Sequence, residues 1–477
     1  MNFFETRNVV FAWIVCYKRA DPSRTRRHDL SQLFPTADIQ PTTTSNDPPP
    51  LYVQRRLRTP VRDQMLMRPA SLDQELPQDH PVRFVWALVE KLDVSPWLKL
   101  FKAVEDRPGR DGHDPRLLLA IWVWATVEGE SSARRVDRLC RDHVAYRWLC
   151  GGVSMNYHSL SDFRSLSEEQ FEDVIVQIVG SLMNSGLVSL KRLAQDGMKV
   201  RAAAGKSSFR RSETLVECLQ EARQHLAELR ARTPAESAEF TRREQAAQAR
   251  AAREKVERLE QAIAECEQLS QQNAAARKAR QKPPRVSTTD PQARVMKFSD
   301  HGFRPGYNVN FASDTQSSII VGDQVTNAGT DHGQLGPMMD QLEQRFGAIP
   351  EELLVDGGCA TQTEITTLAQ RGVKVFSPVK NAAKELAAGK NPYARKRDDT
   401  DEVAAWRTRM GEAASQELYK LRSQVAEWVN AVCRNHDFRQ LLVRGVKKSR
   451  SVSRLHVIAH DLLHGERLRI AAAEASG

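Results

Sequence analysis

The stretch from Glu351 to Pro378 constrains the fold most, because it predicts a strand, a helix and a second strand in close succession. An apolar run ends at Asp356, and the two glycines that follow allow the backbone to turn sharply. Thr361 and Thr363 are candidate caps for the helix, and Gly372 is expected to end it. Ligands of open α/β sheets bind beyond the carboxyl ends of the strands, which is where this pattern places Asp356. A single acid at a strand end is more often a turn residue, so a catalytic role requires partners elsewhere in the chain.

Composition narrows the possible partners of the chain. Its 477 residues carry a net charge of +10, which favours a polyanion such as nucleic acid, although an ordinary basic soluble protein explains the same charge. The seven cysteines are scattered without the spacing of a zinc site, and no apolar run approaches the roughly 20 residues that span a bilayer. We therefore expect a reduced, cytoplasmic protein of about two to four domains that does not enter a membrane.

Shifts in composition predict the domain boundaries. Residues 1–64 are rich in Pro, Thr and Ser, and we expect a disordered extension or a wrongly assigned start, with Met65 or Met67 as the true first residue. The other expected segments are a helical DNA-binding domain (65–188), a catalytic domain in two pieces (189–211 and 286–448), a helical hairpin or coiled coil inserted between them (212–285), and a C-terminal helix with a tail (449–477). The hairpin could serve self-association, DNA binding or neither.

One helix of the expected N-terminal helical domain is strongly basic. Ser131 and Ser132 are candidate caps for this helix, which carries Arg134, Arg135 and Arg138. Cations on one helix suit the DNA backbone, but most charge runs are simply solvated helix faces. The two interpretations have similar weight at this point.

A second acid lies on another predicted strand. Residues 190–200 predict a strand that holds Asp196, and the cations Arg201 and Lys206 follow it. An acid on a strand, followed by cations, suits a substrate that bears phosphates.

A third acid, Glu427, lies in a helix expected over residues 415–434, which follows a charged stretch from about 380 to 412 that is expected to be irregular. Asp290, Asp331 and Glu364 are weaker candidates, because they lie in linker or helix-start segments where acids commonly cap helices.

The three acids can meet if the fold is α/β with a mixed, ribonuclease H-like sheet and flanking helices. Crowded carboxylates are costly unless cations neutralise them, and hard oxygen ligands suit Mg²⁺ or Mn²⁺. A pair of such ions about 4 Å apart can activate a nucleophilic oxygen and stabilise the leaving oxygen on phosphorus. The pattern therefore predicts metal-dependent chemistry on phosphodiesters.

Several short motifs occur in an order typical of one family. They are Tyr157-His158 with Asp162-Phe163-Arg164, Asp196-Gly197, Gly306-Tyr307-Asn308, Val355 to Gly358, and the run from Tyr419 to Arg434. With them the chain, from about Met65 to its end, resembles the DDE transposases of bacterial insertion sequences, in the group whose last catalytic helix carries a Tyr-Arg-Glu-Lys signature. Each motif is weak alone, and their order and spacing together carry the resemblance.

The resemblance implies roles for single residues. Two Mg²⁺ or Mn²⁺ ions are expected on Asp196, Asp356 and Glu427, and DNA is expected to contact Tyr419, Arg422 and Arg434. Arg434 stands where the family usually has Lys, which keeps the charge but changes the geometry of the contact. Trp428, beside the acid, is a second departure.

The resemblance also implies an activity and partners. We expect a transposase that hydrolyses phosphodiesters at the ends of an insertion sequence and joins the freed 3′ hydroxyl to target DNA, acting as a homo-oligomer on DNA. Two alternatives stay open, namely a metal-dependent nuclease without strand transfer and an inactive copy that only binds DNA.

Overall fold

The computed structural model describes residues 70–99, 111–231, 241–275 and 283–476. The chain divides into two units, Met1–Arg68 and Pro69–Gly477, and all described residues belong to the second. The extension expected over residues 1–64 therefore lies outside the described residues.

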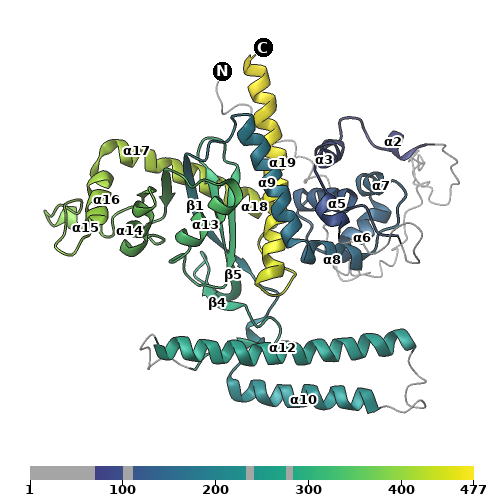
Figure 1. The fold of residues 1–477 in the computed structure, drawn as a ribbon. Coiled ribbons are helices and arrows are strands. Elements are labelled where there is room, and N and C mark those ends of the chain that lie inside the picture. The colour runs from purple at the N-terminus through teal and green to yellow at the C-terminus, as the bar shows by residue number, and fades with distance from the viewer. Residues whose placement is uncertain (1–69, 100–110, 232–240, 276–282, 477) are drawn as a thin grey trace, which may run out of the picture. The chain divides into compact units, whose positions relative to one another are not determined.

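The described chain from residue 70 to residue 184 contains helices and loops only (Figure 1). The helices are α2 (Leu72–Glu75), α3 (Pro81–Val89), α4 (Ser95–Leu98), α5 (Pro115–Val127), α6 (Ala133–Asp142), α7 (Val144–Cys150), α8 (Tyr157–Leu166) and α9 (Glu168–Asn184). The Ser132 hydroxyl caps the basic helix α6 by accepting from the backbone N–H of Arg135 at 3.4 Å, as expected. Helix α5 is apolar and buried along almost its whole length, so it forms the centre of this helical region.

A six-stranded mixed sheet follows the helices. Its strands are β1 (Arg192–Arg201), β4 (Arg294–Lys297), β5 (Phe303–Asp314), β6 (Ile320–Thr326), β7 (Glu352–Val355) and β8 (Lys374–Phe376). The order is β4-β5-β1-β7-β8, and β6 pairs with β5. Strand β5 is antiparallel to β1 and β6, whereas β1, β7 and β8 are parallel. This arrangement is compatible with a ribonuclease H-like fold, and the predicted fold class is confirmed.

The helix between β7 and β8 begins and ends where the sequence predicts. Helix α14 (Gln362–Gln370) starts after Thr361, whose hydroxyl accepts from the N–H of Glu364, while the Glu364 carboxylate accepts from the N–H of Thr361. Gly372 follows the helix with φ +86°, a conformation that favours glycine. This capping fixes the loop that begins at Asp356.

Two expectations about the later helices are wrong. The stretch from about 380 to 412, which was expected to be irregular, contains α15 (Ala382–Ala387) and α16 (Asp401–Gly411). Helix α16 forms despite its charged sequence because Thr400 caps it and the face that carries Trp406 is buried. The single helix expected over residues 415–434 is instead divided into α17 (Ala413–Arg422), a π-helical turn η4 (Ser423–Glu427) and α18 (Trp428–Asn435).

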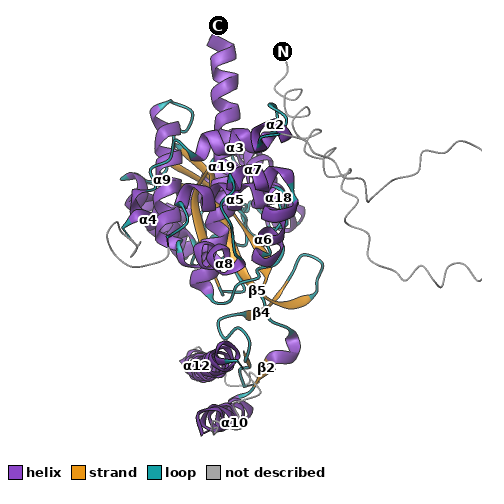
Figure 2. Cartoon of the chain, turned by 90° about the vertical axis from the view of Figure 1, so that its right-hand side faces the viewer, coloured by secondary structure: helices purple, strands orange, loops and turns teal. Residues whose placement is uncertain are grey.

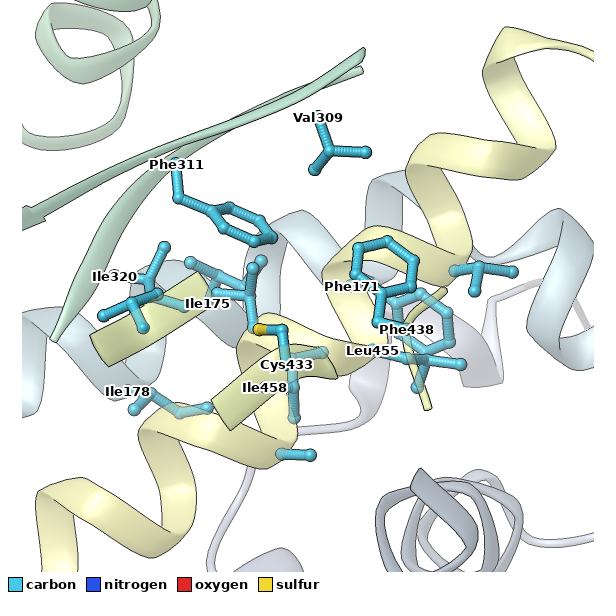
Figure 3. Packing of buried hydrophobic residues seen from close by; sticks show 14 of the residues in the cluster. Phe171, Ile175, Ile178, Val309, Phe311, Ile320, Cys433, Phe438, Leu455 and Ile458 are labelled. Carbon is cyan, nitrogen blue, oxygen red and sulfur yellow. The ribbon is translucent and has the colours of Figure 1, made fainter. Parts of the chain in front are cut away.

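The last helix, α19 (Val446–Ser476), lies in the core rather than at the periphery. It packs on α5, α8, α9 and β6, and residues 451–462 are all buried. Figure 3 shows Leu455 and Ile458 of α19 among Phe171 of α9, Phe311 of β5 and Cys433 of α18. One hydrophobic core therefore joins the N-terminal helices to the sheet.

A buried ion network also joins these elements. Asp323 of β6, with a fully buried side chain, accepts from Arg345 of α13 (Leu335–Phe346) and Arg454 of α19. Both guanidinium groups also contact Glu172 of α9. The network pairs every charge that it buries, as charges in a protein interior require.

The expected helical hairpin lies between two short strands, β2 (Phe209–Arg210) and β3 (Val286–Ser287), which pair with each other. Its helices are α10 (Ser212–Ala231) and α12 (Arg242–Ala275), and Figure 1 and Figure 2 show them side by side. A separate small core holds them together through Leu215, Leu219, Ala222, Leu259, Ala262, Cys266 and Val286. None of the described helices is both long and apolar enough to span a membrane.

Candidate active site

Asp196 on β1 and Asp356, the first residue after β7, follow a matched pair of residues on two adjacent parallel strands. Gln195 of β1 pairs with Val355, the last residue of β7, so the next residue along each segment is one of the two acids. Matching positions on parallel strands point to the same face of a sheet. The Asp196 side chain is largely buried, with 19% exposed, whereas Asp356 lies exposed at the start of the loop before α14. The fold therefore brings these two acids together.

Two side chains from the late helical segment bind the Asp196 carboxylate. Arg422, the last residue of α17, donates from Nη2 to Oδ1 at 3.0 Å, and Asn430 of α18 donates from Nδ2 to Oδ2 at 3.0 Å. Burial raises the pKa of Asp196, and the Arg422 charge opposes that rise. Both carboxylate oxygens thus have protein partners, and the guanidinium balances the buried negative charge.

The π-helical turn brings Glu427 to the side of Arg422. In an α-helix, residues five apart point about 140° away from each other, since there are about 3.6 residues per turn. A π-helix bonds residues five apart, so η4 places Arg422 and Glu427 on one side, with Nη1 and Oε1 4.0 Å apart. The Glu427 side chain remains 65% exposed.

Asp331 is a fourth acid in the same neighbourhood, although the sequence made it a weaker candidate. Its Oδ1 accepts from Nδ2 of Asn308 at 2.5 Å, and a Cβ built on Gly197 would lie 2.3 Å from the same oxygen. Burial raises the pKa of Cys359 to about 12, and the charges of Asp331, Asp356 and Asp196 add to the rise. The three aspartates therefore lie near enough to act electrostatically on one buried thiol. Asp331 lies in the loop after β6, and no local sequence pattern marks it as a site residue.

The other two weaker candidates have structural roles. Buried Asp290 accepts from the hydroxyl of Tyr307 at 2.8 Å, and Glu364 belongs to the capping box of α14.

The acids suit a divalent cation by chemistry but do not yet enclose one. Carboxylate oxygens are the ligands that Mg²⁺ and Mn²⁺ prefer. Within the described ranges, no three side chains of His, Cys, Asp or Glu come together closely enough to hold a metal ion. The guanidinium of Arg422 balances the charge of the Asp196 carboxylate. The donor set therefore fits a hard cation, whereas the side-chain positions do not form a coordination sphere.

Comparison with known families identifies two segments. Residues 70–166 match the family described as transposase domain (DUF772), and residues 279–461 match the family described as transposase DDE domain. The segment of residues 279–461 is thus similar to a transposase DDE domain. No curated protein and no solved structure matches the chain.

The two family matches include most residues of the candidate site but not Asp196. Asp331, Asp356, Arg422 and Glu427 all lie within the transposase DDE domain. Asp196 lies between the two matched segments, and it is the strand pairing of β1 with β5 and β7 that joins it to the DDE domain.

The transposase domain at residues 70–166 contains the predicted basic helix α6. Arg134 and Arg138 are exposed on it, whereas Arg135 pairs with Glu130 at 2.7 Å. The Arg134 guanidinium lies 5.1 Å from the ring centre of Tyr157, and the Tyr157 and His158 ring centres are 3.9 Å apart with the rings tilted by 32°. Arg134 and Arg138 are thus available to a partner, and Arg135 is engaged within the chain.

The remaining residues predicted to contact DNA lie in two places, the helical segment of α17 and α18, and the chain at the end of β1. Tyr419 is partly buried near Asp356, and burial raises its pKa to about 12 with Arg422 opposing the rise. Arg434 is exposed at the end of α18, and Arg201 is exposed at the end of β1, where its backbone N–H donates to the carbonyl of Arg439 at 3.0 Å. Lys206 is exposed in the short 3₁₀-helix η3 (Lys206–Ser208).

Proposed function

We propose that the chain is the transposase of an insertion sequence. It cuts phosphodiester bonds at the ends of the element and joins the freed 3′ hydroxyl to target DNA. The observation that carries the proposal is the pairing of β1 with β7, which sets Asp196 beside Asp356 in a ribonuclease H-like sheet that includes a transposase DDE domain. The net charge of +10 supports DNA as the partner.

Asp196, Asp356 and Glu427 would hold the metal ions, with Asp331 close enough to contribute to the negative potential. When bound, two Mg²⁺ or Mn²⁺ ions supply an activated nucleophilic oxygen and stabilise the leaving oxygen. The Glu427 side chain is 65% exposed, so it is free to change position when DNA and metal bind.

The chain's own cations and hydrogen-bond donors prepare this site. Arg422 keeps the buried Asp196 carboxylate charged, and Asn430 fixes the direction of its second oxygen. Tyr419, Arg422 and Arg434 lie along one helical segment and would contact the DNA backbone near the cut. Arg134 and Arg138 of α6 would contact DNA at the element ends, and a homo-oligomer would bring two ends together.

The test follows cutting and joining of a DNA duplex that contains the terminal inverted repeat found beside the gene. The full chain is compared in Mg²⁺ with Asp356→Ala, with Glu427→Gln and with Asp340→Asn, a matched control on an exposed acid. Cutting and joining by the parent and the control, but by neither site variant, is the expected result.

Three other outcomes would redirect the proposal. Site variants that cut as well as the parent would exclude these acids from catalysis. Cut but never joined product would favour a nuclease. A parent chain that binds DNA without cutting it would favour an inactive copy.

A further inference from the structure

A pocket of about 290 Å³ lies where the inserted hairpin meets the rest of the described chain. Glu221 of α10, Lys255 and Arg258 of α12, and Arg444 before α19 contribute charged side chains to its lining. Thr288 and Thr289, which follow β3, add hydroxyl groups. The pocket is separate from the acids of the candidate active site and belongs to none of the roles derived above.

The cations of this pocket have few acidic partners among the described residues. Lys255 and Arg444 form no ion pair with any residue of the described ranges. Arg258 approaches Glu254 at 3.8 Å, and its Nε is buried without a hydrogen-bond acceptor. Burial, and then the nearby charge of Arg444, lower the pKa of Arg258. Lys255 and Arg444 are exposed and Arg258 is partly buried, and an anion would offset the repulsion between Arg258 and Arg444.

The walls of the pocket are held in place by hydrogen bonds. The backbone N–H of Gly445 donates to Asp290 at 3.1 Å, and that of Val446 donates to Gln292 at 2.9 Å. These bonds tie the turn that carries Arg444 to the segment that carries the two threonines. Glu265 of α12 pairs with Arg294 of β4, which fixes the helix that carries Arg258 to the sheet. The segments that line the pocket are therefore fixed by the fold, while the Lys255 and Arg444 side chains are exposed to solvent.

We propose that this pocket binds one phosphate group of the DNA backbone, so that the inserted hairpin grips DNA beside the catalytic domain. Guanidinium groups and hydroxyls are the usual partners of phosphate oxygens. A pocket of about 290 Å³ has room for one phosphate group. The inference rests on the proposed function in taking DNA as the partner.

The experiment measures binding of a labelled DNA duplex to the full chain by fluorescence anisotropy at several salt concentrations. Arg258→Gln, Arg444→Gln and their double variant are compared with Arg253→Gln, which removes the same charge from an exposed position of α12. One lost phosphate contact lowers the slope of log K against log salt by about 0.9, which corresponds to an affinity loss of about eightfold at 0.1 M salt. We expect such a loss for each single pocket variant and less than about twofold for the control.

The outcomes separate this inference from the proposed function. Pocket variants that bind DNA as the control does would overturn the pocket proposal alone, while a parent chain with no affinity for DNA would overturn both. Thermal melting of the parent and the double variant in millimolar inorganic phosphate gives the second readout. Stabilisation of the parent alone, with no change in DNA affinity for the variants, would assign the pocket to free phosphate and overturn DNA as the source.

Discussion

Replacing Asp323 with Asn would test how the N-terminal helices are attached to the sheet. The Asp323 side chain is fully buried, and it lies between Arg345 and Arg454, whose side chains are 2% and 8% exposed. Removing one partner of a buried ion pair leaves an uncompensated charge and costs about 3–5 kcal/mol. At about 2–4 °C per kcal/mol, the thermal midpoint should fall by about 6–20 °C.

The control is Asp340→Asn, the same change in a carboxylate that pairs with Arg371 at 2.7 Å but is 68% exposed. Exposed pairs contribute about 0–1 kcal/mol, so its midpoint should fall by less than about 4 °C. Burial raises the pKa of Asp323, but Arg345 and Arg454 outweigh it and lower the pKa overall. The advantage of the parent should therefore be complete above the ordinary pKa of an aspartate and vanish as pH falls through the lower folded value. Equal midpoints for the two variants in scanning calorimetry at pH 7 would refute the reasoning.

Three further changes test the site and the core. Gly197→Ala should lower the cutting rate by about 100-fold or more without loss of DNA affinity, because the new Cβ would displace Asp331; an unchanged rate would exclude a role for that contact. Asn430→Ala should lower the cutting rate by about 10- to 100-fold, since a hydrogen bond to the charged Asp196 contributes about 1.5–3 kcal/mol; equal loss of DNA affinity in binding assays would point to a different role. Asp290→Asn should stabilise the chain at pH 8 and progressively less toward pH 4. Burial raises the pKa of Asp290, so its charged form is unfavourable in the folded state. A difference in thermal midpoint between parent and variant that is equal at both pH values would contradict this.

Much of the sheet could be predicted from the sequence because its signals are local. The apolar run before Asp356, the cap at Thr361 and the glycine at 372 each specify one backbone conformation, and the structure follows them. The small core of the inserted hairpin also follows its apolar spacing, since the contacts lie within two neighbouring helices.

The site was harder to predict because it depends on distant pairings. Asp331 meets Gly197 only after β5, β1 and β7 have paired, and no local pattern in the sequence encodes that approach. The π-helical turn η4 also depends on a distant contact. Arg422 before the turn and Asn430 after it both bind the carboxylate of Asp196, which lies far away in the sequence. The central position of α19 was missed because its polar residues, such as Arg454, find buried partners.

The most direct test of the central claim locates the metal rather than the reaction. Fe²⁺ replaces Mg²⁺ in the full chain, and peroxide with ascorbate generates hydroxyl radicals that cut the peptide chain beside the bound ion. Mass spectrometry should find cuts near Asp196, Asp356 and Glu427, and Asp356→Ala should abolish them. Cuts elsewhere in the chain, or cuts that persist in the variant, would contradict the assignment of these acids as metal ligands.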